Sequence, residues 1–75
     1  MPSRYYVDED TITTVIFDGP VTSVTIFGDN IHARGNAKHD PADKYSETFG
    51  ENLATARAQS RYARKVERRL VRSTR

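Results

Sequence analysis

The sequence predicts a small α+β domain in which a three-stranded antiparallel sheet is followed by one long C-terminal helix. Three observations predict this class. Two runs rich in β-branched and aromatic residues, 11–17 and 21–27, flank a short turn sequence. A third run, 31–38, alternates between apolar and polar residues. The final 27 residues contain no proline and are dominated by good helix formers.

The first two runs predict a β-hairpin, because side chains branched at Cβ suit a pleated strand and crowd a helix. Between the runs, Gly19 accepts a positive φ and Pro20 has no N–H to donate to a ladder, which is typical of a turn. Residues 4–7 could form a short extra strand, but the acidic run 8–10 interrupts it. We therefore assign 1–10 to an N-terminal extension or short strand, and 11–75 to a single β-β-β-α domain.

The third strand is expected to follow a turn at 28–30. Its apolar positions, Ile31, Ala33, Gly35 and Ala37, are mostly small and alternate with polar residues. Small side chains on the inner face allow a bulky element to approach closely. We therefore expect the helix to lie against this strand.

The helix is expected to begin after a loop that contains Pro41. Thr48 and Glu51 match a capping box, in which each side chain binds the backbone N–H of the other residue, and Ser46 is the rival cap. The helix should then continue to about Val71. With residues about 100° apart, one stripe is expected to face the sheet. This stripe comprises Phe49, Leu53, Ala56, Ser60, Ala63, Val66 and Leu70.

A chain of 75 residues allows one domain, near the lower size limit for a self-sufficient hydrophobic core. Only 36% of the residues are hydrophobic, and without cysteine no disulfide can add stability, so a homo-oligomer or a chain completed by a partner is plausible. No apolar run approaches the roughly 18 residues of a membrane span, and the N-terminus lacks the apolar core of a signal peptide. We therefore expect a cytoplasmic protein without a membrane partner.

Charge is divided unevenly along the chain. The first 48 residues carry a net charge of −4 and the last 27 carry +6, so most of the positive charge falls on the predicted helix. Such a face can bind phosphates, bind a protein partner, or only keep the protein soluble. Tyr62 could stack on a base, or pack at the edge of the domain. The candidate binding residues are Arg57, Arg61, Arg64, Lys65, Arg68, Arg69 and Arg72.

Catalytic and metal-binding patterns are absent from the sequence. There is no cysteine, no nucleophile-elbow motif and no glycine-rich phosphate loop. His32 and His39 lie near Asp40 and Asp43, but they fall on a predicted strand and a predicted loop, without ligand spacing. We therefore expect no enzyme activity, no metal, no cofactor and no small-molecule substrate.

A family resemblance appears at three places. Gly35-Asn36-Ala37, then 40–43 (DPAD), then 49–58 (FGENLATARA) resemble the pattern G-x-A, P-x-D, G-x-x-L-A-x-A-R-A of small proteins from actinobacteria and their phages. That family is described as double-stranded-RNA-binding-domain-like and of unknown function. The resemblance spans about 11–70 and implies a three-stranded sheet with one C-terminal helix and no N-terminal helix. It also implies a location in the host cytosol if the chain is phage-encoded.

One departure from true double-stranded-RNA-binding domains concerns the start of the helix. Those domains place lysines at the N-terminus of the C-terminal helix, where they meet phosphate. Here that position reads FGEN (49–52), and the cations lie in the middle and at the end of the helix.

The sheet face away from the helix is expected to carry apolar residues, because alternation sends them to both faces. Val24 and Phe27 are the candidate interface residues. Two functions follow from these patterns. The first is a small, phage-related module that contacts nucleic-acid phosphates through the Arg-rich helix face with little sequence specificity. The alternative is a protein–protein interaction module, such as a phage accessory protein, inhibitor or virion component, that docks through the sheet face and the basic helix.

Overall fold

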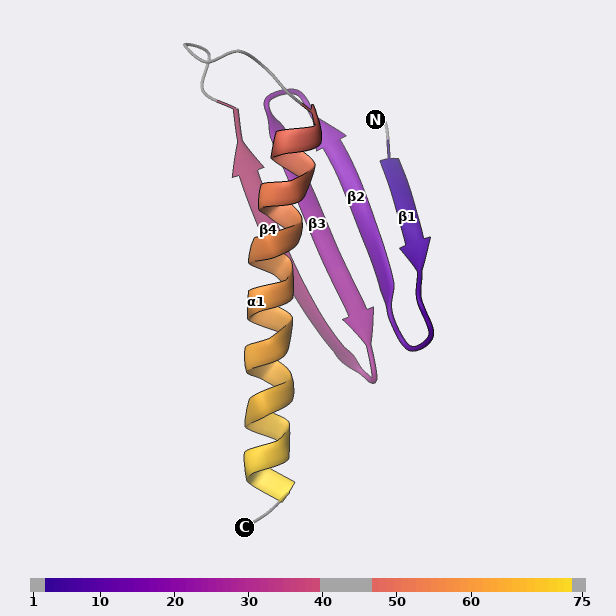
Figure 1. The fold of residues 1–75 in the computed structure, drawn as a ribbon, viewed down its shortest axis with the longest axis vertical. Helices are drawn as coiled ribbons and strands as arrows, with labels where there is room; N and C mark the ends of the chain where they lie inside the picture. The colour runs from indigo at the N-terminus through magenta and orange to yellow at the C-terminus, as the bar shows by residue number, and fades with distance from the viewer. Residues whose placement is uncertain (1–2, 40–46, 74–75) are drawn as a thin grey trace.

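The computed structural model describes residues 3–39 and 47–73, and it contains one sheet and one helix (Figure 1). Strands β1 (Ser3–Val7), β2 (Ile12–Asp18), β3 (Val21–Gly28) and β4 (Ile31–Lys38) pair antiparallel in sequence order. Helix α1 (Glu47–Ser73) crosses one face of this sheet. The α+β class and the C-terminal helix are confirmed, but the predicted strand number was wrong, because the sheet has four strands.

The additional strand is β1, at the N-terminus. The acidic run 8–10, which we expected to interrupt a strand, instead forms the turn between β1 and β2. The Asp8 amide donates to the Thr11 carbonyl at 2.9 Å, and the Glu9 amide donates to the Asp8 carboxylate at 2.8 Å. Val7 then pairs with Ile12, and the ladder continues to the other end of β1. A short polar run between two β-rich runs therefore closes a hairpin here.

Two further turns connect β2 to β3 and β3 to β4. Gly19 has a φ of 57°, as its position in the first turn requires. In the second turn, Asp29 and Asn30 have φ values of 52° and 61°. Positive φ at both central residues matches the twist of antiparallel strands.

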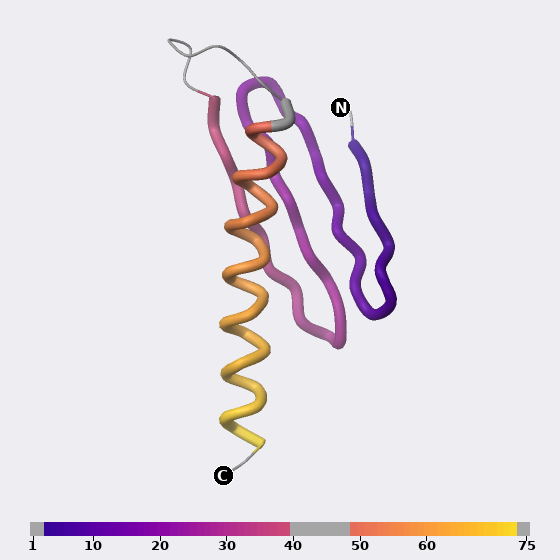
Figure 2. The backbone as a smooth tube through the Cα atoms, in the orientation of Figure 1, coloured from indigo at the N-terminus to yellow at the C-terminus, as the bar shows by residue number. Residues whose placement is uncertain are grey.

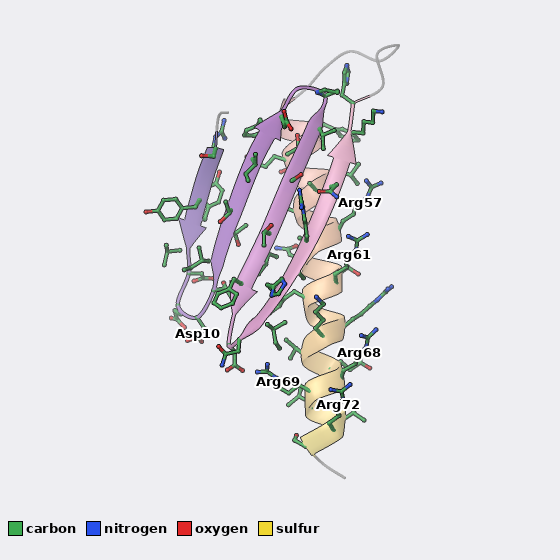
Figure 3. All side chains as sticks on the ribbon, turned by 180° about the vertical axis from the view of Figure 1, so that it is seen from behind. Asp10, Arg57, Arg61, Arg68, Arg69 and Arg72 are labelled. Carbon is green, nitrogen blue, oxygen red and sulfur yellow. The ribbon has the colours of Figure 1, made fainter. Side chains whose placement is uncertain are left out.

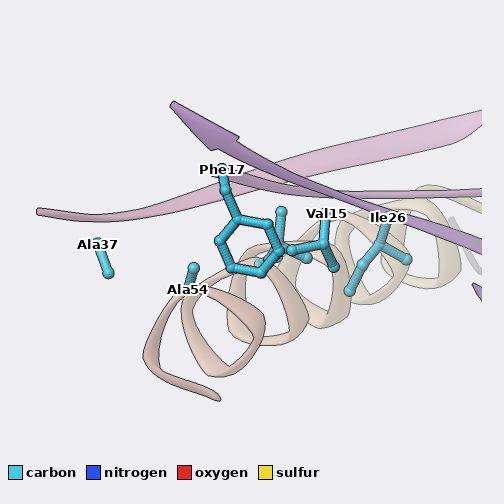
Figure 4. Close-up of a cluster of buried hydrophobic side chains, with 7 residues drawn as sticks. Val15, Phe17, Ile26, Ala37 and Ala54 are labelled. Atoms are coloured by element: carbon cyan, nitrogen blue, oxygen red, sulfur yellow. The ribbon is translucent and has the colours of Figure 1, made fainter. Parts of the chain in front are cut away.

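Helix α1 packs mainly over β3 and β4 (Figures 1 and 2). Gly35 lies directly beneath it, and a Cβ atom at that position would overlap the carbonyl oxygen of Ala54 and the amide nitrogen of Ala58. The small residues of β4 therefore allow the close approach that their alternation predicted. The hydrophobic core consists of Val15, Phe17, Val24, Ile26, Ala37, Ala54 and Ala58, with Leu53 and Tyr62 packed against it (Figure 4).

The helix stripe that faces the sheet differs from the predicted one. Ala54 and Ala58 are fully buried, whereas Phe49 and Leu70 are mostly exposed. Close approach to β4 selects the smallest side chains for the interface, and the predicted stripe gave more weight to the largest apolar ones. Thr48 lies inside α1, which begins one residue earlier, and the rival cap Ser46 and the loop at Pro41 fall outside the described residues.

The helix is longer than the sheet, and its last turns extend past the β3–β4 turn (Figure 2). The Cα atoms span 49 × 23 × 14 Å, so the projecting end of α1 contributes to the longest dimension. Leu70 and Val71 lie on this end and are at least half exposed. Within residues 3–39 and 47–73, no helix has the length and apolar character needed to cross a membrane.

Candidate nucleic-acid interface

A column of four cationic side chains on α1 binds backbone carbonyls along the sheet edge formed by β4. Arg57 donates to the Asn36 carbonyl at 2.7 Å, Arg61 to that of Arg34 at 2.5 Å, and Lys65 to that of His32 at 2.6 Å. In the β3–β4 turn, Arg69 donates to the Asp29 carbonyl at 2.6 Å. We call Arg57, Arg61, Lys65 and Arg69 the edge ladder.

The edge ladder results from two matching repeats. Four residues of helix rise about 6 Å, and two residues of strand rise about 6.6 Å. A cation at every fourth position of α1 therefore meets every second carbonyl of β4, and the helix runs antiparallel to the strand. Alternate carbonyls of an edge strand point away from the sheet and lack a strand partner. The edge ladder supplies these carbonyls with donors.

The ladder residues remain exposed to solvent although each one binds a carbonyl. A guanidinium has five N–H donors and an ammonium has three, so the hydrogen bonds described here leave capacity for a second acceptor. Arg69 also forms an ion pair with the Asp29 carboxylate at 2.9 Å. The contacts with β4 and with the β3–β4 turn therefore fix these cations in a column about 18 Å long.

The other three candidate residues on the helix, Arg64, Arg68 and Arg72, form a second column that we call the free stripe. All three are exposed, and their side chains make no hydrogen bond or ion pair within the described part of the chain. At about 100° per residue, the edge ladder and the free stripe together occupy roughly 140° of the helix circumference. The cations therefore gather on one side of α1, with Arg57 and Arg61 next to β4 (Figure 3).

The two columns meet at a groove beneath the projecting end of α1. The groove has a volume of about 400 Å³ and lies between the helix and the start of β4. Lys65 and Arg69 of the edge ladder, and Arg68 and Arg72 of the free stripe, line it. The remaining lining residues are Asn30, Ile31 and His32, so the groove itself contains no carboxylate among the described residues. A concave surface with four cations suits an anion such as phosphate.

The acidic residues of the β1–β2 turn lie on the side of the sheet away from β4. Asp8, Glu9 and Asp10 are exposed in the β1–β2 turn, and β1 and β4 are the two opposite edges of the sheet. Figure 3 shows Asp10 at the β1–β2 turn, and Arg57 and Arg61 beside β4 at the opposite edge of the sheet. For the three acidic residues of this turn the division of charge along the sequence is therefore also a division in space, whereas Asp29 lies beside Arg69.

Three other candidate residues are placed differently from one another. Tyr62 is half-buried against the core and its hydroxyl donates to the Gly28 carbonyl at 3.0 Å, which favours the packing alternative over stacking. Val24 is fully buried beneath α1, so its assignment to an exposed interface was wrong. Phe27 lies three positions further along the same strand, on the opposite face, and is 47% exposed.

Sequence reasoning missed the cationic residues of β4. Arg34 and Lys38 are exposed on the sheet face away from the helix, and the Arg34 guanidinium donates to the Ser23 hydroxyl at 3.2 Å. The alternation that placed Ala33 and Ala37 on the inner face could have placed these residues on the outer one. Within the described residues, no group of three or more histidine, cysteine, aspartate or glutamate side chains could hold a metal ion.

A single α1 laid on a four-stranded antiparallel sheet, with cations along one sheet edge, defines a small α+β domain with a basic helix. Comparison with protein families assigns it more closely, because a family model described as Rv2632c-like matches residues 7–72. The chain belongs to the Rv2632c-like family, and that description names no activity. Neither the comparison with curated proteins nor that with solved structures gave a match.

Proposed function

We propose that this chain is a non-enzymatic module that binds the phosphate backbone of a nucleic acid along the β4 edge and the projecting end of α1. One observation carries the proposal. Seven cations lie on one side of α1, and the acidic turn lies at the far edge of the sheet. A row of cations can contact successive phosphates of one backbone, and each phosphate contact releases condensed counterions.

The double-stranded-RNA-binding-domain-like resemblance is compatible with this class of partner, but fold alone does not define function. In this chain the cations line the middle and end of the helix, so the proposed geometry differs from that of a lysine cluster at the helix N-terminus. A phage-related origin and a cytoplasmic location remain predictions from the sequence.

The proposal is tested by removing the free stripe. The variant Arg64→Gln, Arg68→Gln, Arg72→Gln should weaken binding of a fluorescent mixed-sequence oligonucleotide more than about tenfold in low salt. The slope of log K against log salt should also become shallower by roughly two to three, because about 0.7–0.9 is lost for each phosphate contact. Fluorescence anisotropy at four salt concentrations measures both quantities.

A matched control variant distinguishes loss of the binding site from a change in net charge. The variant Ala56→Glu, Gln59→Glu, Ala63→Glu also lowers the net charge by three, on exposed positions of α1 away from the cations. It should bind nearly as well as the unmutated protein. The alternative function, a protein-docking module, predicts that loss of the free stripe leaves oligonucleotide binding unchanged, and that result would reject the proposal.

A further inference from the structure

The sheet face opposite α1, which we call the open face, carries two exposed aromatic rings. Tyr5 on β1 is 70% exposed and Phe27 on β3 is 47% exposed. Among the described residues no element covers this face, because α1 packs on the other side of the sheet (Figures 1 and 3). A contiguous group of large apolar side chains exposed on a sheet face often marks a binding surface, whereas single exposed apolar residues are common on any protein.

The strand register places these rings in neighbouring rows. Val7, Ile12, Phe27 and His32 are paired across the four strands in one row. The next row on the same face begins with Tyr5 and ends with Arg34. With strands about 4.8 Å apart and rows about 6.7 Å apart, the Cα atoms of the two aromatic residues are roughly 12 Å apart. Each row therefore runs from an apolar or aromatic side chain on β1 to a polar or cationic one on β4.

The charge on the open face falls next to the edge ladder. Arg34 and Lys38 project from β4 onto this face, and the carbonyls of the same strand bind the ladder cations. Among the described residues, Asp18 at one corner is the only carboxylate that the strand alternation places on this face. A phosphate backbone that follows the β4 edge would therefore have the aromatic residues of β1 and β3 to its inner side.

We propose that the open face binds a single-stranded nucleic acid, with bases stacked on Phe27 and Tyr5 and with phosphates along the β4 edge. This inference rests on the proposed function and specifies its substrate. The flat faces of a base stack on aromatic side chains, whereas in a duplex these faces are already covered by neighbouring bases. Exposed rings on a sheet therefore select unpaired bases.

A second copy of this chain is a poorer occupant. Two open faces packed together would bury Arg34 and Lys38 of both copies, and each copy offers only Asp18 on this face as a partner among the described residues. Unpaired buried cations are unfavourable. A single strand instead brings one phosphate per nucleotide to the same cations.

The test compares one labelled twelve-nucleotide single strand with its duplex. Phe27→Leu and Tyr5→Leu remove a ring and keep an apolar side chain, and each should weaken single-strand binding roughly tenfold while duplex binding stays unchanged. Tyr6→Leu is the matched control, because it removes the same side chain from the next residue of β1, which faces the other side of the sheet. Thermal unfolding by circular dichroism checks that each variant is folded.

The possible results separate the two proposals. If the Phe27→Leu, Tyr5→Leu double variant binds the single strand as the unmutated protein does, but loss of the free stripe abolishes binding, the stacking proposal is overturned and phosphate binding survives. Absence of oligonucleotide binding in low salt overturns both. Self-association in sedimentation that Phe27→Leu abolishes, without any effect on the single strand, assigns the open face to a second copy and also overturns stacking.

Discussion

At the scale of single residues, Gly35 decides how closely α1 can approach the sheet. A methyl group at this position would overlap backbone atoms of Ala54 and Ala58 and lie 2.9 Å from the Arg57 Cβ atom. Because a helix backbone cannot move aside locally, Gly35→Ala should lower the free energy of unfolding by about 3 kcal/mol. In a domain of this size that corresponds to a fall in Tm of roughly 10–20 °C, measurable by circular dichroism.

Gly19→Ala serves as the control for this prediction. Gly19 has a positive φ, but a Cβ atom there would meet nothing within 4 Å. Its substitution should therefore cost only about 1–2 kcal/mol, which is the strain of a left-handed conformation. If Gly35→Ala melts at a higher temperature than Gly19→Ala, the close contact between α1 and β4 is not present in solution.

Prediction from the sequence succeeded for residues whose position follows from one pattern, the two-residue alternation of a β-strand. Alternation along 31–38 correctly placed Ala33 and Ala37 on the inner face. It could not reveal that Arg61 binds a carbonyl of β4 and that Arg64 does not. This difference depends on where the helix crosses the sheet, and no local pattern in the chain encodes that position.

At the scale of elements, the edge ladder protects β4. An edge strand with free carbonyls can pair with another chain and start aggregation. The variant Arg57→Gln, Arg61→Gln, Lys65→Gln shortens or neutralises three donors, so carbonyls of β4 lose their charged partners. We expect this variant to aggregate faster, as measured by light scattering and thioflavin fluorescence during heating.

The free-stripe variant, Arg64→Gln, Arg68→Gln, Arg72→Gln, is the control because it removes the same charge and leaves the edge ladder intact. It should aggregate no faster than the unmutated protein. Equal acceleration in both variants would mean that net charge, and not the covered edge, keeps the protein in solution.

The elements themselves were predicted unevenly. The long helix and the hairpin of β2 and β3 followed from propensity and turn residues, and both are present. Strand β1 was left open as an extension or a short strand, because the acidic run after it looked like an interruption. In the structure the Asp8 amide donates to the Thr11 carbonyl and the Asp8 carboxylate accepts from the Glu9 amide, which closes a turn. A short polar run has the same composition whether it interrupts a strand or forms a turn. Only the pairing of β1 with β2 distinguishes the two outcomes.

At the scale of the whole molecule, the sequence divides charge between its two halves, and the fold keeps the acidic β1–β2 turn away from the cations along β4, although Asp29 pairs with Arg69. The sequence could predict a basic helix and an acidic front. It could not predict that β1 and β4 would become opposite edges, because that order depends on the fourth strand. The proposed interface therefore has a position that the charge pattern alone does not specify.

This separation predicts that binding follows the position of charge more than the total. The β1–β2 turn lies two to three strand spacings from β4, or roughly 10–14 Å, which exceeds the screening length of about 8 Å at physiological ionic strength. The variant Asp8→Asn, Glu9→Gln, Asp10→Asn raises the net charge by three, yet it should strengthen oligonucleotide binding by less than about threefold under these conditions. Removing the same amount of charge from the free stripe should weaken binding more than about tenfold.

Anisotropy titrations at physiological and at low salt provide the measurement. The turn variant should gain affinity only in low salt, where the screening length reaches about 30 Å. Changes of equal size in both variants at physiological salt would show that the overall field of the protein, and not a local row of cations, attracts the nucleic acid.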